Sequence, residues 1–185
     1  LEHLIFHIIS PIMSEMGSRW EQGEIDIASE HLITNFLRQR LLQWMRTGPP
    51  SYDVNPVVLA GAPTELHEGG LLMMGVLLRR LRWPVSYLGQ SISLVGFDTF
   101  IDQLEPSVVV FVAMTGQSAQ ELQEWPRWLP KVYKTNTPSI CYAGRIFTER
   151  PDYIQRVPGT FLGRNLEEGI VTLDRMLNDL FPNAR

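Results

Sequence analysis

The chain has 185 residues, of which 44% are hydrophobic and 19% are charged. This composition is typical of a globular protein with a packed core and excludes a disordered chain. The 16 basic and 20 acidic residues give a formal charge of −4 at pH 7, so no net positive field draws the chain to nucleic acid or anionic lipid. A single cysteine, Cys141, excludes an intrachain disulfide and a thiolate zinc cluster and is typical of a cytoplasmic protein.

The N-terminal segment, residues 1–44, has helical periodicity and few helix breakers. It begins without Met and carries Glu2, His3 and His7, so we expect a fragment that starts inside a helix and not a signal peptide. Residues 47–56 contain three prolines and a glycine and form a predicted linker. The sequence therefore predicts two units, a helical bundle over 1–48 and a second domain over 56–185.

Beyond the linker, short β-branched runs alternate with amphipathic stretches. Strands are predicted over 57–60, 85–88, 108–113, 139–142 and 160–162, with helices over 69–82, 95–104, 119–129 and 166–180. The longest apolar run, 71–78, is too short to span a bilayer, so we expect no membrane contact. Near-continuous apolar strands between helices predict an α/β domain, a doubly wound, Rossmann- or flavodoxin-like five-stranded parallel sheet. Such sheets bind ligands beyond the carboxyl ends of their strands.

The loop after the first predicted strand contains Glu65-x-His67-x-x-Gly70. Imidazole is a good donor to cobalt, iron or zinc, and a carboxylate two residues away can accept its second N–H and fix the tautomer. Gly69 and Gly70 let a bulky ligand approach the backbone. The alternative interpretation is a surface histidine in a turn.

A second unusual pattern lies in the helical segment, where Asp26 is a predicted N-cap of a helix that runs to about Met45. Glu30 falls at the centre of an apolar stripe, with His31 beside it and Trp20 before the helix. A buried carboxylate needs a polar partner or ligand. The alternatives are a cluster facing a polar ligand and a capping or interhelix hydrogen-bond cluster.

These two patterns together carry a resemblance. Glu65-x-His67-x-x-Gly70 is similar to the Asp-x-His-x-x-Gly motif of cobalamin-binding domains, and Trp20 with Glu30-His31 resembles the Trp-x9-Glu-His signature of CarH-type, cobalamin-dependent regulators of the MerR class. The resemblance covers about residues 4–180.

The resemblance implies that His67 is the lower cobalt ligand and that Glu65 orients it. It places Trp20, Glu30 and His31 above the corrin ring, around the upper ligand. The remaining implied cofactor-binding residues belong to the same loop and to the ends of the later strands, where the nucleotide tail descends: Leu66, Glu68, Gly69, Gly70, Gly89, Val112, Met114, Thr115, Ala143 and Gly144.

The chain also departs from the family. The third strand has Val112-Ala113-Met114 where relatives often have Ser-x-Leu or Ser-x-Val, so Thr115 or Ser118 would supply the missing hydroxyl. Light-sensing relatives have a histidine directly after the bundle tryptophan, which can take the upper cobalt site after photolysis, and here that residue is Glu21.

The resemblance implies a cobalamin-binding sensory or regulatory module, and not an enzyme. It would respond to light or cobalamin, act as a homo-oligomer or with a partner regulator, and reach DNA only through a segment absent from this chain. Three alternatives stay open: a corrinoid methyl carrier of a methyltransferase system, a haem- or bilin-binding sensor on the same fold, and an α/β interaction domain with no cofactor. A carrier must expose the upper face of its corrin, which the Trp20 and Glu30-His31 set would obstruct.

Overall fold

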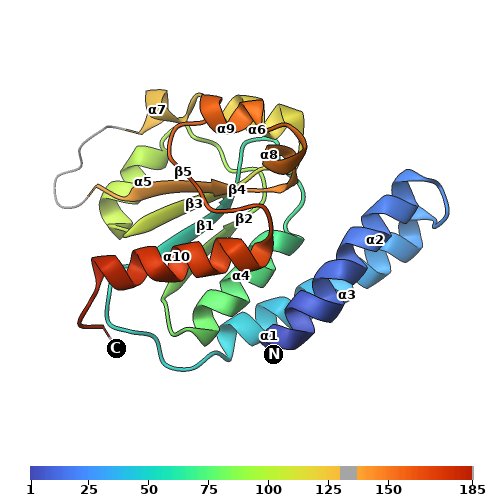
Figure 1. Ribbon diagram of the computed structural model, residues 1–185, viewed down its shortest axis with the longest axis horizontal. Helices are drawn as coiled ribbons and strands as arrows, with labels where there is room; N and C mark the ends of the chain where they lie inside the picture. Colours follow the sequence, from blue (N-terminus) through green and yellow to red (C-terminus); the bar gives the residue numbers. More distant parts are fainter. Residues whose placement is uncertain (130–136, 185) are drawn as a thin grey trace.

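The computed structural model describes residues 1–129 and 137–184, apart from the side chain of Glu21. Its N-terminal helices stand beside an α/β unit (Figure 1). The first long helix runs through α1 (Glu2–Leu4), the π-helical stretch η1 (Ile5–Ile9) and α2 (Ser10–Glu21), and α3 (Ile27–Arg46) returns beside it. We call these elements the helical hairpin. Asp26 caps α3 as predicted, because its carboxylate accepts a hydrogen bond from the backbone N–H of Ser29 at 2.9 Å.

The α/β unit has a five-stranded sheet in the order β2-β1-β3-β4-β5, and every strand pair is parallel. Its strands are β1 (Val57–Gly61), β2 (Val85–Gly89), β3 (Val108–Val112), β4 (Ser139–Ala143) and β5 (Thr160–Phe161). The predicted fold class, N-terminal helices followed by a doubly wound parallel sheet, is confirmed.

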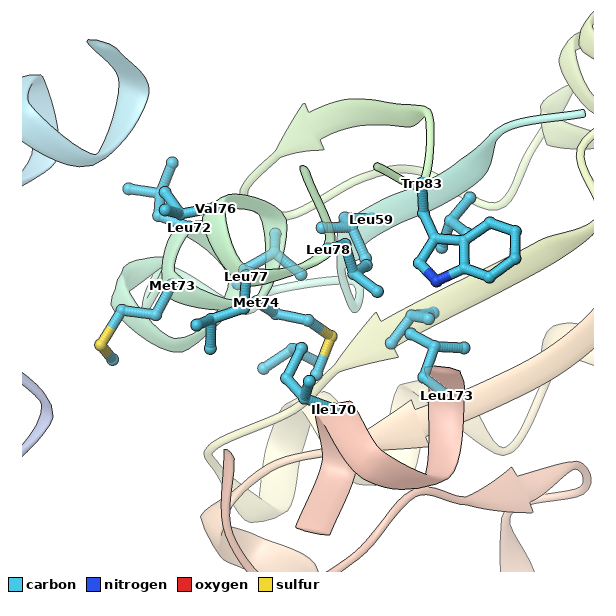
Figure 2. Close-up of a cluster of buried hydrophobic side chains, with 14 of the residues drawn as sticks. Leu59, Leu72, Met73, Met74, Val76, Leu77, Leu78, Trp83, Ile170 and Leu173 are labelled. Carbon is cyan, nitrogen blue, oxygen red and sulfur yellow. The ribbon is translucent and has the colours of Figure 1, made fainter. Parts of the chain in front are cut away.

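Helices cover both faces of this sheet. One face packs against α4 (Gly69–Arg80) and α10 (Leu166–Leu180), and Figure 2 shows the cluster between them, with Leu59, Trp83, Ile170 and Leu173. The other face packs against α5 (Phe97–Leu104), α6 (Gly116–Leu122), α7 (Trp125–Trp128), α8 (Arg145–Glu149) and α9 (Asp152–Arg156). Successive residues of β1 and β3 alternate between the two clusters, as side chains of a strand must.

Several predicted helices have different bounds in the structure. The helix expected over 119–129 is two helices, because Thr115 and Ser118 form a capping box that starts α6 earlier and Pro126 lies in the first turn of α7. The helix expected from residue 95 begins at Phe97, after Gly96 with a φ of 76°. Helices α8 and α9 were not predicted, since five residues each are too few to show a period.

The linker of residues 47–56 is held against the end of α4. The Arg79 guanidinium donates to the carbonyl of Pro49 at 2.8 Å, and Arg82 donates to that of Pro50 at 3.1 Å. Arg82 also lies over the ring of Tyr52, 4.7 Å from its centroid. These contacts fix the base of the helical hairpin on the α/β unit. No helix in the described ranges is both long and apolar enough to cross a membrane.

Gly144, directly after β4, has a φ of 136°, and a Cβ there would lie 1.8 Å from the carbonyl oxygen of Ala113. We expect Gly144→Ala to lower the free energy of unfolding by at least about 2 kcal/mol, because both strain and overlap must be relieved. Urea unfolding followed by circular dichroism measures this. Gly17→Ala is the matched control, since nothing lies within 4 Å of its Cβ position in α2. Equal unfolding midpoints for the two variants would contradict the prediction.

Candidate functional site

The loop of residues 62–68 leaves the carboxyl end of β1, the strand between β2 and β3. Helix α4 follows β1 on one face of the sheet, and α6 follows β3 on the other. The chain therefore diverges between these strand ends, which is the topological switch point at which doubly wound sheets bind ligands. The histidine motif lies at this point.

His67 and Glu65 form the centre of the loop. The Nδ1 atom of His67 lies 2.6 Å from Oε1 of Glu65, which also accepts the backbone N–H of His67 at 2.8 Å. The Glu65 side chain is fully buried, whereas the His67 side chain is 61% exposed. A carboxylate acceptor holds the proton on Nδ1 and leaves the lone pair on Nε2, which is the arrangement of a metal-ligating histidine with its orienting carboxylate.

Two further donors complete the surroundings of Glu65. Its Oε2 accepts the backbone N–H of Met114 at 2.5 Å and the hydroxyl of Ser118 at 2.7 Å. Burial acts to raise the pKa of Glu65, but the hydrogen bonds from His67, Met114 and Ser118 together lower the pKa to about 2. Glu65 is therefore a carboxylate at neutral pH and an acceptor for the His67 ring.

Ser118 has a different role from the one that the sequence suggested. The sequence offered it as a substitute for a hydroxyl near the nucleotide tail, but its own hydroxyl donates to Glu65 and lies 2.9 Å from that of Thr115. It is fully buried. The Thr115-x-x-Ser118 spacing of a capping box was the signal that could have placed Ser118 at a helix start beside the loop.

Glu68 forms a second set of contacts that the sequence did not reveal. One carboxylate oxygen accepts from Nε of Arg38 in α3, and the other accepts from the hydroxyl of Tyr87 in β2. The Glu68 side chain is only 11% exposed. Arg38 lies thirty residues before Glu68 in the chain, and no local spacing predicts such a pair.

The remaining predicted residues of the loop and of the start of α4 are Leu66, Gly69 and Gly70. Leu66 is 67% exposed, and its carbonyl accepts from the side chain of Gln90. At Gly69 a Cβ would lie 2.3 Å from the end of the Met13 side chain of α2, whereas at Gly70 it would meet nothing within 4 Å. Gly69 thus allows α2 to approach the start of α4.

Trp20 lies near the end of α2, and Glu30 and His31 lie near the start of α3, so all three are at the same end of the helical hairpin. His31 Nδ1 is 2.7 Å from Oε2 of Glu30, and the Thr34 hydroxyl donates to Oε1 of Glu30 at 2.6 Å. The predicted apolar stripe is only partly buried, because Leu41 is fully covered but Ile33 is 40% exposed. Figure 1 shows this end of the hairpin standing away from the α/β unit, so the structure does not bring these residues against His67.

The expected tail-binding residues gather at neighbouring strand ends. Val112 ends β3 and pairs with Ala143, which ends β4. Met114 and Thr115 are the second and third residues after β3, and the Met114 sulfur lies 3.4 Å from the backbone nitrogen of Arg145. Gly144 follows Ala143, and Gly89 ends β2 with a φ of 86°. These positions share the sheet edge of the His67 loop.

The sequence matches known proteins in two comparisons. Residues 1–43 match the family model of the B12 binding domain. The HTH-type transcriptional repressor CarH of Myxococcus xanthus is 31% identical over 117 residues, which cover 63% of this chain and 39% of that protein. The repressor CarA of the same organism is 33% identical over 112 residues, covering 60% of this chain and 37% of CarA. The matched region thus spans less than two fifths of either relative.

Solved structures share the fold. The monomethylamine corrinoid protein of Methanosarcina barkeri superposes with a TM-score of 0.67 at 14% identity, covering 94% of this chain and 83% of that chain. A cobalamin-binding protein from Desulfitobacterium hafniense gives a TM-score of 0.56 at 17% identity, covering 88% of this chain and 77% of that chain. At these identities the likeness concerns the fold.

Proposed function

We propose that this chain, a cobalamin-binding domain distantly similar to CarH and CarA, works as a sensory and regulatory module and not as an enzyme. The observation that carries the proposal is the pair of exposed His67 and buried, ionised Glu65 at the switch point of the sheet. A histidine held in this way is prepared to bind a metal centre through Nε2.

The residues present fit cobalamin. His67 would bind cobalt from below, with Glu65 fixing its tautomer, and the strand ends at Gly89, Val112 and Ala143 would accommodate the nucleotide tail. Gly70, where a Cβ would meet nothing within 4 Å, leaves open space at the start of α4. When bound, the cofactor supplies a cobalt centre whose upper ligand can be exchanged.

The set of Trp20, Glu30 and His31 at one end of the hairpin supports a sensor over a methyl carrier. Trp20 is 47% exposed and the His31 side chain is 66% exposed, and both lie at the end of the hairpin that stands away from the α/β unit. A bound corrin would give these groups a surface to cover, and closure of the hairpin over an upper ligand would be the response that a partner or a second copy reads.

A corrinoid methyl carrier is the second candidate. It is favoured by the fold shared with the monomethylamine corrinoid protein. In that case the hairpin would have to stay open so that a methyltransferase reaches the cobalt. The two functions therefore differ in whether the hairpin closes over the upper ligand.

Absorption spectra test the proposed function. The purified protein is recorded as isolated and after incubation with hydroxocobalamin, adenosylcobalamin or haem. A histidine-bound cobalamin spectrum with one cofactor per chain supports the proposal. Binding of haem or a bilin, without binding of cobalamin, would contradict the proposal. A change of oligomeric state that depends on the upper ligand would distinguish the sensor from the carrier.

Trp20→Ala should weaken retention of a bulky upper ligand, because the indole is the largest side chain at the free end of the hairpin. We expect the affinity for adenosylcobalamin to fall by about tenfold, equivalent to about 1.4 kcal/mol, with hydroxocobalamin much less affected. Titration followed by absorption measures both affinities. Trp128→Ala is the control, since Trp128 is similarly exposed (44%, against 47% for Trp20) but lies on α7. Equal losses for the two cobalamins would contradict a role above the corrin.

Glu21 leads to a prediction about light. Its side chain lies outside the described residues, so the prediction depends on residue type alone. A carboxylate is a harder ligand than imidazole and is costly to bury as an anion. We therefore expect Glu21 not to replace the second histidine in a stable adduct with cobalt. After illumination of the adenosylcobalamin complex we expect water or hydroxide at the upper position. A bis-histidine spectrum, for instance through His31, would contradict this.

A further inference from the structure

In the sequence, His67 lies between Glu65 and Glu68, whose carboxylates are hydrogen-bonded to different parts of the molecule. Glu65 is held by Met114 and Ser118, which follow β3 in the α/β unit. Glu68 is held by Arg38, in the helical hairpin, and by Tyr87 of β2. The loop that carries the predicted cobalt ligand thus connects the sheet to the hairpin.

Glu68 is well placed to transmit a movement of the loop. It is the residue directly after His67, and its carbonyl accepts the N–H of Leu72 at 2.9 Å, in the first turn of α4. Its side chain is 11% exposed, and Arg38 is 42% exposed. Separating the pair would leave a largely buried carboxylate without its cation, which is strongly unfavourable. The loop and α3 are therefore expected to move together.

We propose that the Arg38–Glu68 ion pair couples the ligation of His67 to the position of the helical hairpin. The inference rests on the proposed binding of cobalamin. If the backbone at His67 shifts when the ring binds cobalt, Glu68, the next residue, shifts with it. The ion pair with Arg38 then moves α3. The Tyr87 hydroxyl of β2 donates to the other carboxylate oxygen and so orients the Glu68 side chain toward Arg38. Arg38 and Glu68 are positioning residues in this device.

Hydrogen–deuterium exchange on the intact chain tests the coupling. The exchange of α3 amides around Arg38 is measured with and without hydroxocobalamin, for the wild type, Arg38→Met, Glu68→Gln and the double variant. Arg40→Met is the matched control, because Arg40 lies on the same helix and donates only weakly, at 3.4 Å, to Gln43 of α3. Absorption spectra of the same samples report whether His67 is bound to cobalt.

In the wild type and Arg40→Met we expect cobalamin to change exchange in α3 by about fivefold or more. In Arg38→Met the histidine-bound spectrum should remain, with affinity within about tenfold of the wild type, but the response of α3 should be lost. Glu68→Gln should lose the same response, and the double variant should lose no more than either single variant.

A response of α3 that persists in Arg38→Met would overturn the coupling, as would a wild type that binds cobalamin without any response of α3. A wild type that binds no cobalamin would overturn the proposed function, and the coupling with it. The spectra distinguish these cases, because they report binding independently of exchange.

Discussion

Replacing His67 with alanine is expected to abolish the histidine-bound cobalamin spectrum and to weaken cobalamin binding by at least 10–100-fold, the loss typical when even the outer support of a metal ligand is removed. The physical reason is that the imidazole is the donor that Glu65 orients, 2.6 Å from its carboxylate. Titration of the purified variant with hydroxocobalamin, followed by absorption, measures both effects.

His3→Ala is the matched control for this variant. His3 is an exposed histidine of α1 whose ring lies 4.5 Å from that of His7, remote in sequence from the loop. Its spectrum and affinity should equal those of the wild type. If His67→Ala kept the wild-type spectrum and affinity, His67 would not be the lower ligand.

Glu65→Gln is expected to affect both stability and binding. The amide preserves the shape of the side chain but has one acceptor oxygen in place of two, whereas His67, Met114 and Ser118 together donate four hydrogen bonds. At least one of these donors therefore loses its partner in a fully buried place. We expect the free energy of unfolding at pH 7 to fall by about 2–4 kcal/mol and cobalamin affinity by about 10–100-fold. Urea unfolding and cobalamin titration measure these losses.

The same carboxylate predicts a pH dependence. Because hydrogen bonds in the folded state lower the pKa of Glu65 from 4.5 to about 2, its contribution to stability is fully present above about pH 4.5 and is lost as pH falls toward 2. The contribution is about 3 kcal/mol at neutral pH by the linkage relation. The stability difference between the wild type and Glu65→Gln should therefore shrink between pH 4.5 and pH 2, and a constant difference would contradict the assigned role.

The sequence predicted those parts of the fold that depend on local patterns. Runs such as 108–112 are apolar at every position because the strand is buried on both faces, and Asp26 caps α3 through contacts within one turn. The helices of five residues, α8 and α9, have no such pattern and were missed.

In the candidate site, too, contacts between residues close in sequence could be predicted, and contacts between distant residues could not. Glu65 and His67 are two residues apart, so their hydrogen bond could be predicted from spacing. The partners that bury and ionise Glu65 come from positions 114 and 118, and the partner of Glu68 comes from position 38. These contacts depend on how strands and helices pack, which residue spacing does not encode.

The attachment of the linker has a mechanical consequence for α3. The contacts of Arg79 and Arg82 with Pro49 and Pro50 hold the chain just beyond the end of the helix at Arg46. With a rise of 1.5 Å per residue, Arg38 lies about 12 Å from that end, and the start of the helix lies about 28 Å from it. A rigid helix pivoting at its fixed end acts as a lever. A displacement of the arginine by the loop would be roughly doubled where Glu30 and His31 lie.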